Sequence, residues 1–435
     1  MISRLLLKAY YLLLPFKVWP NFSSFIPKAT LADFLIVPIG MLALRKFGKL
    51  FDRKWWTISD LLAVAWLLMA VLSMLIRSAP TANLLELTAT FYLVSLYFSV
   101  RLIVEPKYVA VIIGAFITAG FIWAVIAIGG WLLAMATQEE LIVVLSRKTY
   151  PYLGNIYRAQ ALTGSPNMLL SFLMVGILFS WARLITIEDR RLINSTVLIT
   201  MLIGMLLTFS RDVLIVFACM VIVYLLSNTA ISRTKRITRF ILLLTVFLAI
   251  MSYTFISHVV ITPNNDEAIR QLVIGEYIKD EKPFVTLGEP NNDYALYPSI
   301  YFELKKAALL AFLDSRGIGV GGGNFNQYLY QLKSQGQYPA KFTEWDPHST
   351  YLGTLAEHGL IGFLIVCGIL VSFCGKSVVR LYSRGNRDFV AIGLVGVFIG
   401  IAIEAICVDV MNFRQYWILF ALGATYLSAK SDLLT

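Results

Sequence analysis

The chain has 435 residues, of which 58% are hydrophobic and 14% are charged, and its mean hydropathy is +0.74. Soluble domains contain roughly 45–50% apolar and about 25% charged residues. The composition therefore excludes a soluble enzyme, a secreted disulfide-stabilised domain and a disordered chain. It predicts an all-α polytopic membrane protein.

The net charge is +11, from 37 basic and 26 acidic residues. In a membrane protein such an excess is typical of cytoplasmic loops, so we predict no nucleic-acid partner. The four cysteines fall in or at the ends of apolar runs and form no Cys-x-x-Cys pair. We therefore expect neither a disulfide nor a zinc site.

Apolar runs of spanning length recur from the first residues to the last. A helix needs about 20 apolar residues to cross a hydrocarbon core of about 30 Å. A shorter first run, from Leu5 to about Val18, is interrupted by Lys8 and Pro15, and with it we expect about 12 transmembrane helices. The longer runs begin near Leu31, Thr57, Ala82, Tyr108, Ser165, Leu192, Asp212, Ile237, Ser349, Asp388 and Asn412.

Basic residues are concentrated in every second short loop. Under the positive-inside rule these loops are cytoplasmic, which places both termini in the cytoplasm. The basic loops are residues 45–56, 101–107, 183–191, 228–239 and 375–388.

Two large segments then lie outside the cytoplasm, at about 137–164 and at 258–348. We expect three parts along the chain: nine helices in residues 1–257, a large extracytoplasmic loop at 258–348, and three helices in 349–435. Within the loop, residues 298–314 have helical periodicity, which indicates a short helix along the membrane surface.

Seven ionisable residues fall in or beside the predicted spans, all toward the outer face. Ionisable side chains in a membrane are costly and often mark function. Their one-sided distribution argues against a conduction path and fits a site that handles an amphiphile with a charged head. The seven are Asp33, Glu86, Arg211, Asp212, Glu404, Asp409 and Arg414.

Four segments carry candidate chemistry. Arg158 precedes Ser165-Pro166-Asn167, whose Ser and Pro are a favourable helix start. Arg211 lies in a tight turn between two spans. Residues 317–325 contain five glycines, so backbone N–H groups there can approach a ligand closely. His348 lies just before a span.

In this order the segments resemble the O-antigen ligase and Wzy-type polysaccharide polymerase superfamily, over nearly the whole chain. The specific features are a His-Ser-x-x-Leu motif that continues to Glu-x-Gly-x-x-Gly, and a G-x-G-x-G-N-F turn. The entry Thr30-Leu31-Ala32-Asp33 and the Ser210-Arg211 turn support them. The specific residues are His348, Ser349, Leu352, Glu357, Gly359, Gly362, Gly319, Gly321, Gly323, Asn324 and Phe325.

The resemblance implies a GT-C-like membrane glycosyltransferase that needs no cofactor and no metal. Its donor would be a glycan on undecaprenyl diphosphate, and its acceptor a sugar hydroxyl at the outer face of the cytoplasmic (inner) membrane. Arg211 suits the leaving diphosphate, because guanidinium stays charged and binds phosphate in a bidentate manner. His348 suits the acceptor hydroxyl, because imidazole exchanges protons near neutral pH.

Further residues are candidates for supporting roles. The family has a second arginine in the outer loop, and its expected position here falls near Tyr301, which is not basic. His258 and His358 fall in no motif, and we interpret them as packing or interfacial residues. The candidates for binding the diphosphate or the glycan are Arg158, Gly321, Gly323, Asn324, Lys305, Lys306 and Arg270, and the candidate acidic partners are Asp346, Glu357, Glu404 and Asp409.

Two acceptors fit these expectations. A polymerase would extend another lipid-linked repeat unit, whereas an O-antigen ligase would transfer the glycan to the core sugars of lipid A. We favour the polymerase, because the second loop arginine is missing. A transporter or flippase is a third hypothesis, but no internal repeat, which is common in transporters, is found in the sequence.

Overall fold

The structure is a computed structural model of the chain. It describes residues 2–17, 30–76, 80–139, 141–150, 154–187, 189–227, 233–263, 285–287, 294–340, 342, 344–384 and 388–429. Every statement below concerns these residues.

Each predicted apolar run forms a helix. Five helical segments are long and apolar enough to cross a membrane: Ile58–Leu75, Leu84–Ile103, Pro106–Thr137, Pro166–Thr186 and Thr350–Ser383. The other apolar helices are shorter, so the number of 12 spans remains a prediction. The helices are α1 (Ile2–Leu13), α2 (Ile36–Leu44), α3 (Ile58–Ile76), α4 (Pro80–Ile103), α5 (Val109–Thr137), α6 (Pro166–Thr186), α7 (Arg191–Leu206), α8 (Val213–Ser227), α9 (Arg233–His258), α11 (Ile300–Asp314), α12 (Phe325–Ser334), α13 (Thr350–Arg384), α14 (Phe389–Glu404) and α15 (Arg414–Leu427).

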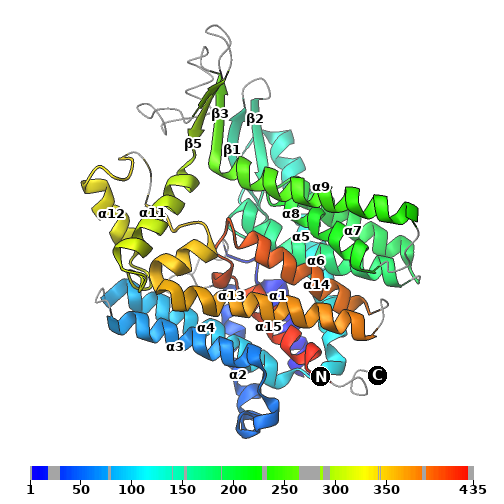
Figure 1. Ribbon diagram of the computed structural model, residues 1–435. Helices are drawn as coiled ribbons and strands as arrows, with labels where there is room; N and C mark the ends of the chain where they lie inside the picture. The colour runs from blue at the N-terminus through cyan, green and yellow to red at the C-terminus, as the bar shows by residue number, and fades with distance from the viewer. Residues whose placement is uncertain are drawn as a thin grey trace.

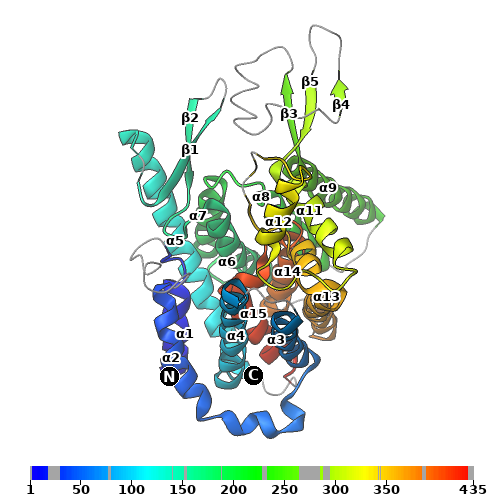
Figure 2. The same cartoon turned by 90° about the vertical axis from the view of Figure 1, so that its left-hand side faces the viewer.

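Helix α6 lies at the centre of the bundle, in contact with α5, α7, α8 and α14 (Figures 1 and 2). Its start follows from the sequence: the Ser165 side chain accepts a hydrogen bond from the amide of Met168, and Pro166 occupies the first turn. The helix is apolar on all sides, as expected for one surrounded by other helices. Of the candidate spans it is the most buried, at 72%.

Two small antiparallel sheets lie in the segments predicted to be outside. Strands β1 (Val144–Tyr150) and β2 (Gly154–Ala159) form one, and β3 (Val259–Pro263), β5 (Tyr294–Pro298) and β4 (Val285–Leu287) form the other, in that order. Figure 2 shows both sheets at the same end of the molecule. The sequence predicted only short surface helices in the larger segment. Strands of this length contain no long apolar run, which is why a search for such runs misses them.

Helix α11 confirms the helix predicted at 298–314. The Ser299 side chain accepts a hydrogen bond from the amide of Phe302, which caps the helix. An apolar face is buried against α12 and α13, and Figure 1 shows the three helices side by side. The buried face consists of Leu304, Ala307, Ala308 and Ala311.

Helix α13 is interrupted at Gly359, whose dihedral angles are φ 66° and ψ −164°. The interruption admits residues 317–325, which we call the Gly turn. A Cβ on Gly359 would lie 2.4 Å from the carbonyl oxygens of Gly317 and Ile318, so only glycine fits. Beyond the break, the amide of Leu360 donates to the carbonyl of Gly317 at 3.0 Å.

The Gly turn replaces the helical hydrogen bonds that the break removes. The amides of Val320 and Gly321 donate to the carbonyls of Ala356 and Glu357, at 2.8 and 2.9 Å. These carbonyls, in the first turns of a membrane helix, would otherwise be unpaired, which is costly. The Gly turn and the first turns of α13 therefore form one unit.

We expect Gly319→Ala to prevent this unit from forming. Gly319 has φ +91°, and an added Cβ would lie 2.5 Å from the carbonyl oxygen of Glu357. Gly336→Ala is the matched control, because Gly336 has φ +71° but nothing within 4 Å of its added Cβ. The control should lose about 1–2 kcal/mol from the left-handed backbone alone. Gly319→Ala should lose clearly more stability, measured as the thermal unfolding midpoint in detergent. Equal losses in the two variants would show that the Gly turn and α13 do not form one unit.

Candidate active site

Three segments distant in sequence meet around Tyr301 on α11. The guanidinium of Arg211, from the α7–α8 turn, lies 5.3 Å from the centroid of the Tyr301 ring. The imidazole of His348, just before α13, contacts the same ring edge to face, with centroids 4.9 Å apart. The structure thus brings together the two predicted catalytic residues, with an aromatic ring between them.

Lys305, one turn after Tyr301 on α11, belongs to the same group. Its ammonium donates to Sγ of Cys407 at 3.5 Å and acts electrostatically on both Arg211 and His348. Its neighbour Lys306 pairs instead with Glu303 at 3.5 Å, and 54% of the Lys306 side chain is exposed. The third candidate, Arg270, lies outside the described residues. The geometry therefore favours Lys305 among the three.

His348 is held in place by the loop that follows α14. Its neighbour Thr350 donates its amide to the carbonyl of Ala405 at 2.9 Å, and the Thr350 hydroxyl accepts from the amide of Val410 at 2.8 Å. The backbone of His348 itself has φ +47°, a left-handed conformation that costs energy in a non-glycine residue. Such conformations cluster at functional sites.

The turn that carries Arg211 is held by strand β2. The amide of Ala159 donates to the carbonyl of Leu207 at 2.8 Å, and the Arg158 guanidinium donates to the carbonyl of Thr208 at 2.9 Å. Arg158 also donates to Oδ1 of Asn167, at the start of α6, at 3.3 Å. Arg158 therefore connects two of the predicted motifs.

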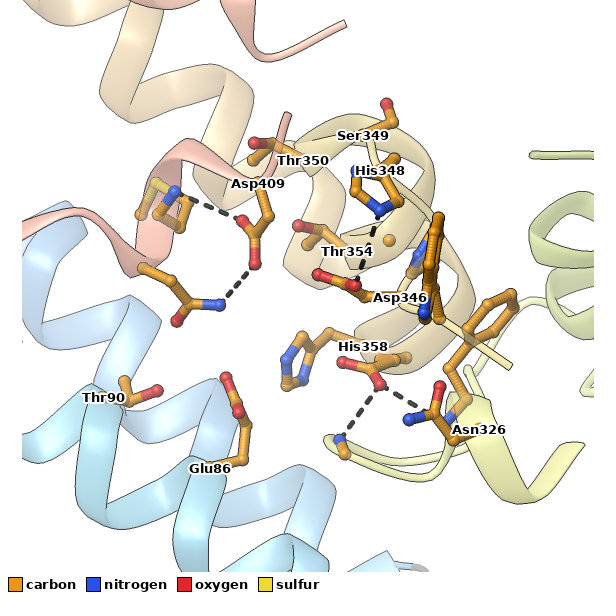
Figure 3. A pocket seen from close by; sticks show the side chains of 18 of the residues that line it. Glu86, Thr90, Asn326, Asp346, His348, Ser349, Thr350, Thr354, His358 and Asp409 are labelled. Atoms are coloured by element: carbon orange, nitrogen blue, oxygen red, sulfur yellow. Dashed lines mark hydrogen bonds and ion pairs between the residues drawn. The ribbon is translucent and has the colours of Figure 1, made fainter. Parts of the chain in front are cut away.

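A cavity of about 480 Å³ opens beside His348 (Figure 3), and Arg211, Tyr301 and Lys305 are not among the residues that line it. Ligand sites have volumes of about 300–1,000 Å³. Helices α3 and α4 form one wall, and the Gly turn, α12 and the first turns of α13 form the opposite wall. The polar residues around it include Glu86, Thr90, Asp346, Thr354, Glu357, His358 and Asp409.

His358 lines this cavity together with His348, which the motif search did not foresee. Its side chain is 5% exposed, and its ring contacts Trp66 edge to face at 5.0 Å. Nδ1 of His358 has no hydrogen-bond partner among the described residues. The helical spacing of Thr350, Thr354 and His358, four residues apart, is the signal that places them on one face of α13.

The amides of the Gly turn are engaged within the protein. The amide of Gly323 donates to Oε1 of Glu357 at 3.1 Å, and that of Asn324 donates to the carbonyl of Gly321 at 3.1 Å. Gly322 donates to the Ser73 hydroxyl of α3 at 2.7 Å. The turn was expected to present these groups to a ligand. Because each amide already has an acceptor, the structure gives the turn a positioning role instead.

The four candidate acidic partners lie in different surroundings. Asp346 is the nearest to the imidazole, with Oδ1 4.0 Å from Nε2 of His348. Glu357 accepts the amides of Gly323 and Phe325. The two remaining residues have structural bonds: Glu404 accepts from the hydroxyls of Ser171 and Tyr416, and Asp409 accepts from the amide of Met411.

Two of the seven ionisable residues, Asp33 and Arg414, form an ion pair although they are 381 residues apart in the sequence. Arg414, at the start of α15, donates through Nε and Nη2 to both carboxylate oxygens of Asp33, at 2.8 and 2.9 Å. Tyr92 of α4 donates to the same carboxylate at 2.5 Å, and Tyr10 of α1 contacts the Tyr92 hydroxyl at 2.7 Å. Four helical regions are therefore joined at Asp33, and the role there is structural.

Burial lowers the pKa of His348 below its ordinary value of about 6.5. Asp346 opposes this effect, whereas the positive charges of Lys305 and Arg211 add to it. Burial also lowers the pKa of Lys305. The His348 imidazole is therefore neutral at pH 7, as a proton acceptor must be.

No group of three or more His, Cys, Asp or Glu side chains in the described ranges is arranged to hold a metal ion. All four cysteines are free. Helices of this length and composition define a multi-pass membrane protein.

Comparison with known families narrows this class. Residues 196–367 match the family described as O-antigen ligase, which confirms the resemblance over this part of the chain. The matched range includes Arg211, Lys305, the Gly turn and His348. No match to the chain is found among curated proteins.

The charges around His348 predict how it titrates. Asp346→Asn should lower the pKa of His348 further, because the carboxylate favours the protonated ring, and Lys305→Met should raise it. Each midpoint should move by about 0.5 pH. NMR of protein with ¹³C-labelled histidine rings, assigned with His348→Gln, measures both. A midpoint that moves in the same direction in both variants would contradict the arrangement.

Proposed function

We propose that the protein is a glycosyltransferase that moves a glycan from a polyprenyl (undecaprenyl) diphosphate to a sugar hydroxyl at the outer face of the cytoplasmic membrane. The observation that carries the proposal is the position of His348. Two cations, Arg211 and Lys305, lie close to it, and it also lines a cavity with carboxylates and hydroxyls that neither cation lines.

The two cations suit one substrate, and the cavity suits the other. A diphosphate gains negative charge as its bond to the sugar breaks, so it belongs beside Arg211 and Lys305. A sugar acceptor presents several hydroxyls, which pair with carboxylate, threonine and histidine side chains of the kind that line the cavity. His348 lies where the two would meet.

The reaction then needs a single proton acceptor and a stabilised leaving group. The neutral imidazole of His348 takes the proton of the acceptor hydroxyl as that oxygen bonds to the anomeric carbon of the donor. The bond from this carbon to the diphosphate oxygen breaks, and the electron pair leaves with the lipid diphosphate. Arg211 and Lys305 stabilise the charge that develops there. Asp346 supports the protonated ring.

We propose a polymerase, with an O-antigen ligase as the alternative. The polymerase version predicts that purified protein with the lipid-linked repeat unit alone produces chains longer than the input. If longer glycans appear only after lipid A–core is added, the ligase version replaces it. In both assays, His348→Ala should lower the rate by about 10²–10⁴-fold and Arg211→Ala by about 10²–10³-fold.

The double variant separates this mechanism from independent effects. Because both side chains act on one transition state, it should be little slower than the slower single variant. A fully multiplicative loss would contradict a shared step. Equal glycan export by wild type and by His348→Ala in cells would instead indicate a transporter.

Adjacent lysines give a matched test of the second cation. We expect Lys305→Met to lower the transfer rate by about tenfold or more, since it removes a charge beside the developing diphosphate. Lys306→Met removes the same charge one residue further on, where the lysine side chain is 54% exposed and pairs with Glu303, and should change the rate by less than about fivefold. Both rates are measured at saturating donor. The reverse order would assign the role to Lys306.

A further inference from the structure

The cavity beside His348 contains buried polar groups that the proposed proton transfer does not use. Thr90 is 4%, Thr354 6% and His358 5% exposed, and all three line the cavity. Nδ1 of His358 has no partner among the residues that the structure describes. Buried polar groups normally have hydrogen-bond partners, so this set indicates a ligand that is rich in hydroxyls.

The charge of the cavity is one-sided. Its lining contains Glu86, Glu344, Asp346 and Asp409, and within the described chain no Lys or Arg lines it. Glu344 is neutralised by Lys333, which reaches it from outside the cavity at 2.5 Å. Glu86, on α4, lies across the cavity from His358, as Figure 3 shows.

An aromatic surface completes the lining. Trp66 of α3 borders the cavity, and its ring contacts that of His358. Aromatic rings pack against the apolar faces of polar ligands, while nearby hydroxyls and carboxylates bind the polar edges. Carboxylates accept hydrogen bonds from sugar hydroxyls but repel a second anion.

We propose that this cavity binds the acceptor sugar and that it selects an uncharged sugar over one that carries a carboxylate or phosphate group. The inference rests on the proposed glycan transfer, which it deepens by naming the chemistry of the acceptor. Arg211 and Lys305, which do not line the cavity, bind the anionic part of the donor. The cations beside His348 therefore bind an anionic donor, and the cavity that His348 lines binds an uncharged acceptor.

Saturation-transfer NMR on the detergent-solubilised full chain tests the selection directly, without turnover. The probes are matched pairs: glucose and glucuronate, galactose and galacturonate, mannose and mannuronate. We expect at least one neutral sugar to bind, and its uronate to bind at least about tenfold more weakly. Thr354→Val, which keeps the shape of the side chain and removes the hydroxyl, should weaken binding of the neutral sugar about fivefold.

Charge removal tests the cause of the discrimination. Glu86→Gln should reduce the ratio of the affinities for a neutral sugar and its uronate by about fivefold or more. Glu139→Gln is the control, because Glu139 is exposed and lies outside the cavity lining, so the same loss of charge should leave the ratio unchanged. Uronates that bind as tightly as neutral sugars, no binding of any neutral sugar, or equal effects of the two variants would each overturn the proposal.

Failure of this proposal is distinguishable from failure of the proposed function. Transfer from a lipid-linked donor is measured separately on the same samples. Transfer without charge discrimination would overturn the cavity proposal alone. Discrimination without any transfer, with either acceptor, would overturn the glycosyltransferase assignment and leave a sugar-binding site.

Discussion

The site depends on the insertion of the Gly turn into the break of α13. A membrane helix cannot leave its carbonyl groups without partners, and the amides of Val320 and Gly321 provide them where Gly359 interrupts the helix. The break turns the first part of α13 into a wall of the cavity. It also holds the Glu357 carboxylate against the amides of Gly323 and Phe325. The Glu-x-Gly-x-x-Gly motif and the glycine-rich turn are therefore two halves of one structural device.

This device separates opposite charges over a short distance. Arg211 comes from the α7–α8 turn and Lys305 from α11, whereas the carboxylates of the cavity come from α4, the segment before α13, α13 itself and the loop after α14. Tyr301 lies between Arg211 and His348, at the position where the sequence comparison expected a cation. Here the cation comes from the next turn of α11, and the aromatic ring supports both neighbours. A reaction that joins an anionic donor to a polyhydroxyl acceptor needs such a division.

The apolar runs predicted the helices, and the motif around His348 predicted where α13 begins. Three features could not be predicted from the sequence. The meeting of Arg211, Tyr301 and His348 depends on how distant helices pack, which one sequence does not reveal. The Gly turn was expected to bind a ligand, because a sequence does not show which acceptors its amides will find. His358 was interpreted as a packing residue, which its burial against Trp66 supports, but its place beside the cavity depends on how the helices pack. The strands lacked the length of apolar sequence on which the prediction relied.

The bidentate pair of Asp33 and Arg414 bears on how the chain is made. A ribosome delivers Asp33 381 residues before Arg414, so the carboxylate must wait for its partner while the helices between them are made. Until then Asp33 has only hydroxyl and amide donors from Tyr92 and Thr30. Helix α15 therefore completes this part of the bundle as it arrives, and a protein truncated before it would leave the Asp33 carboxylate without its guanidinium partner.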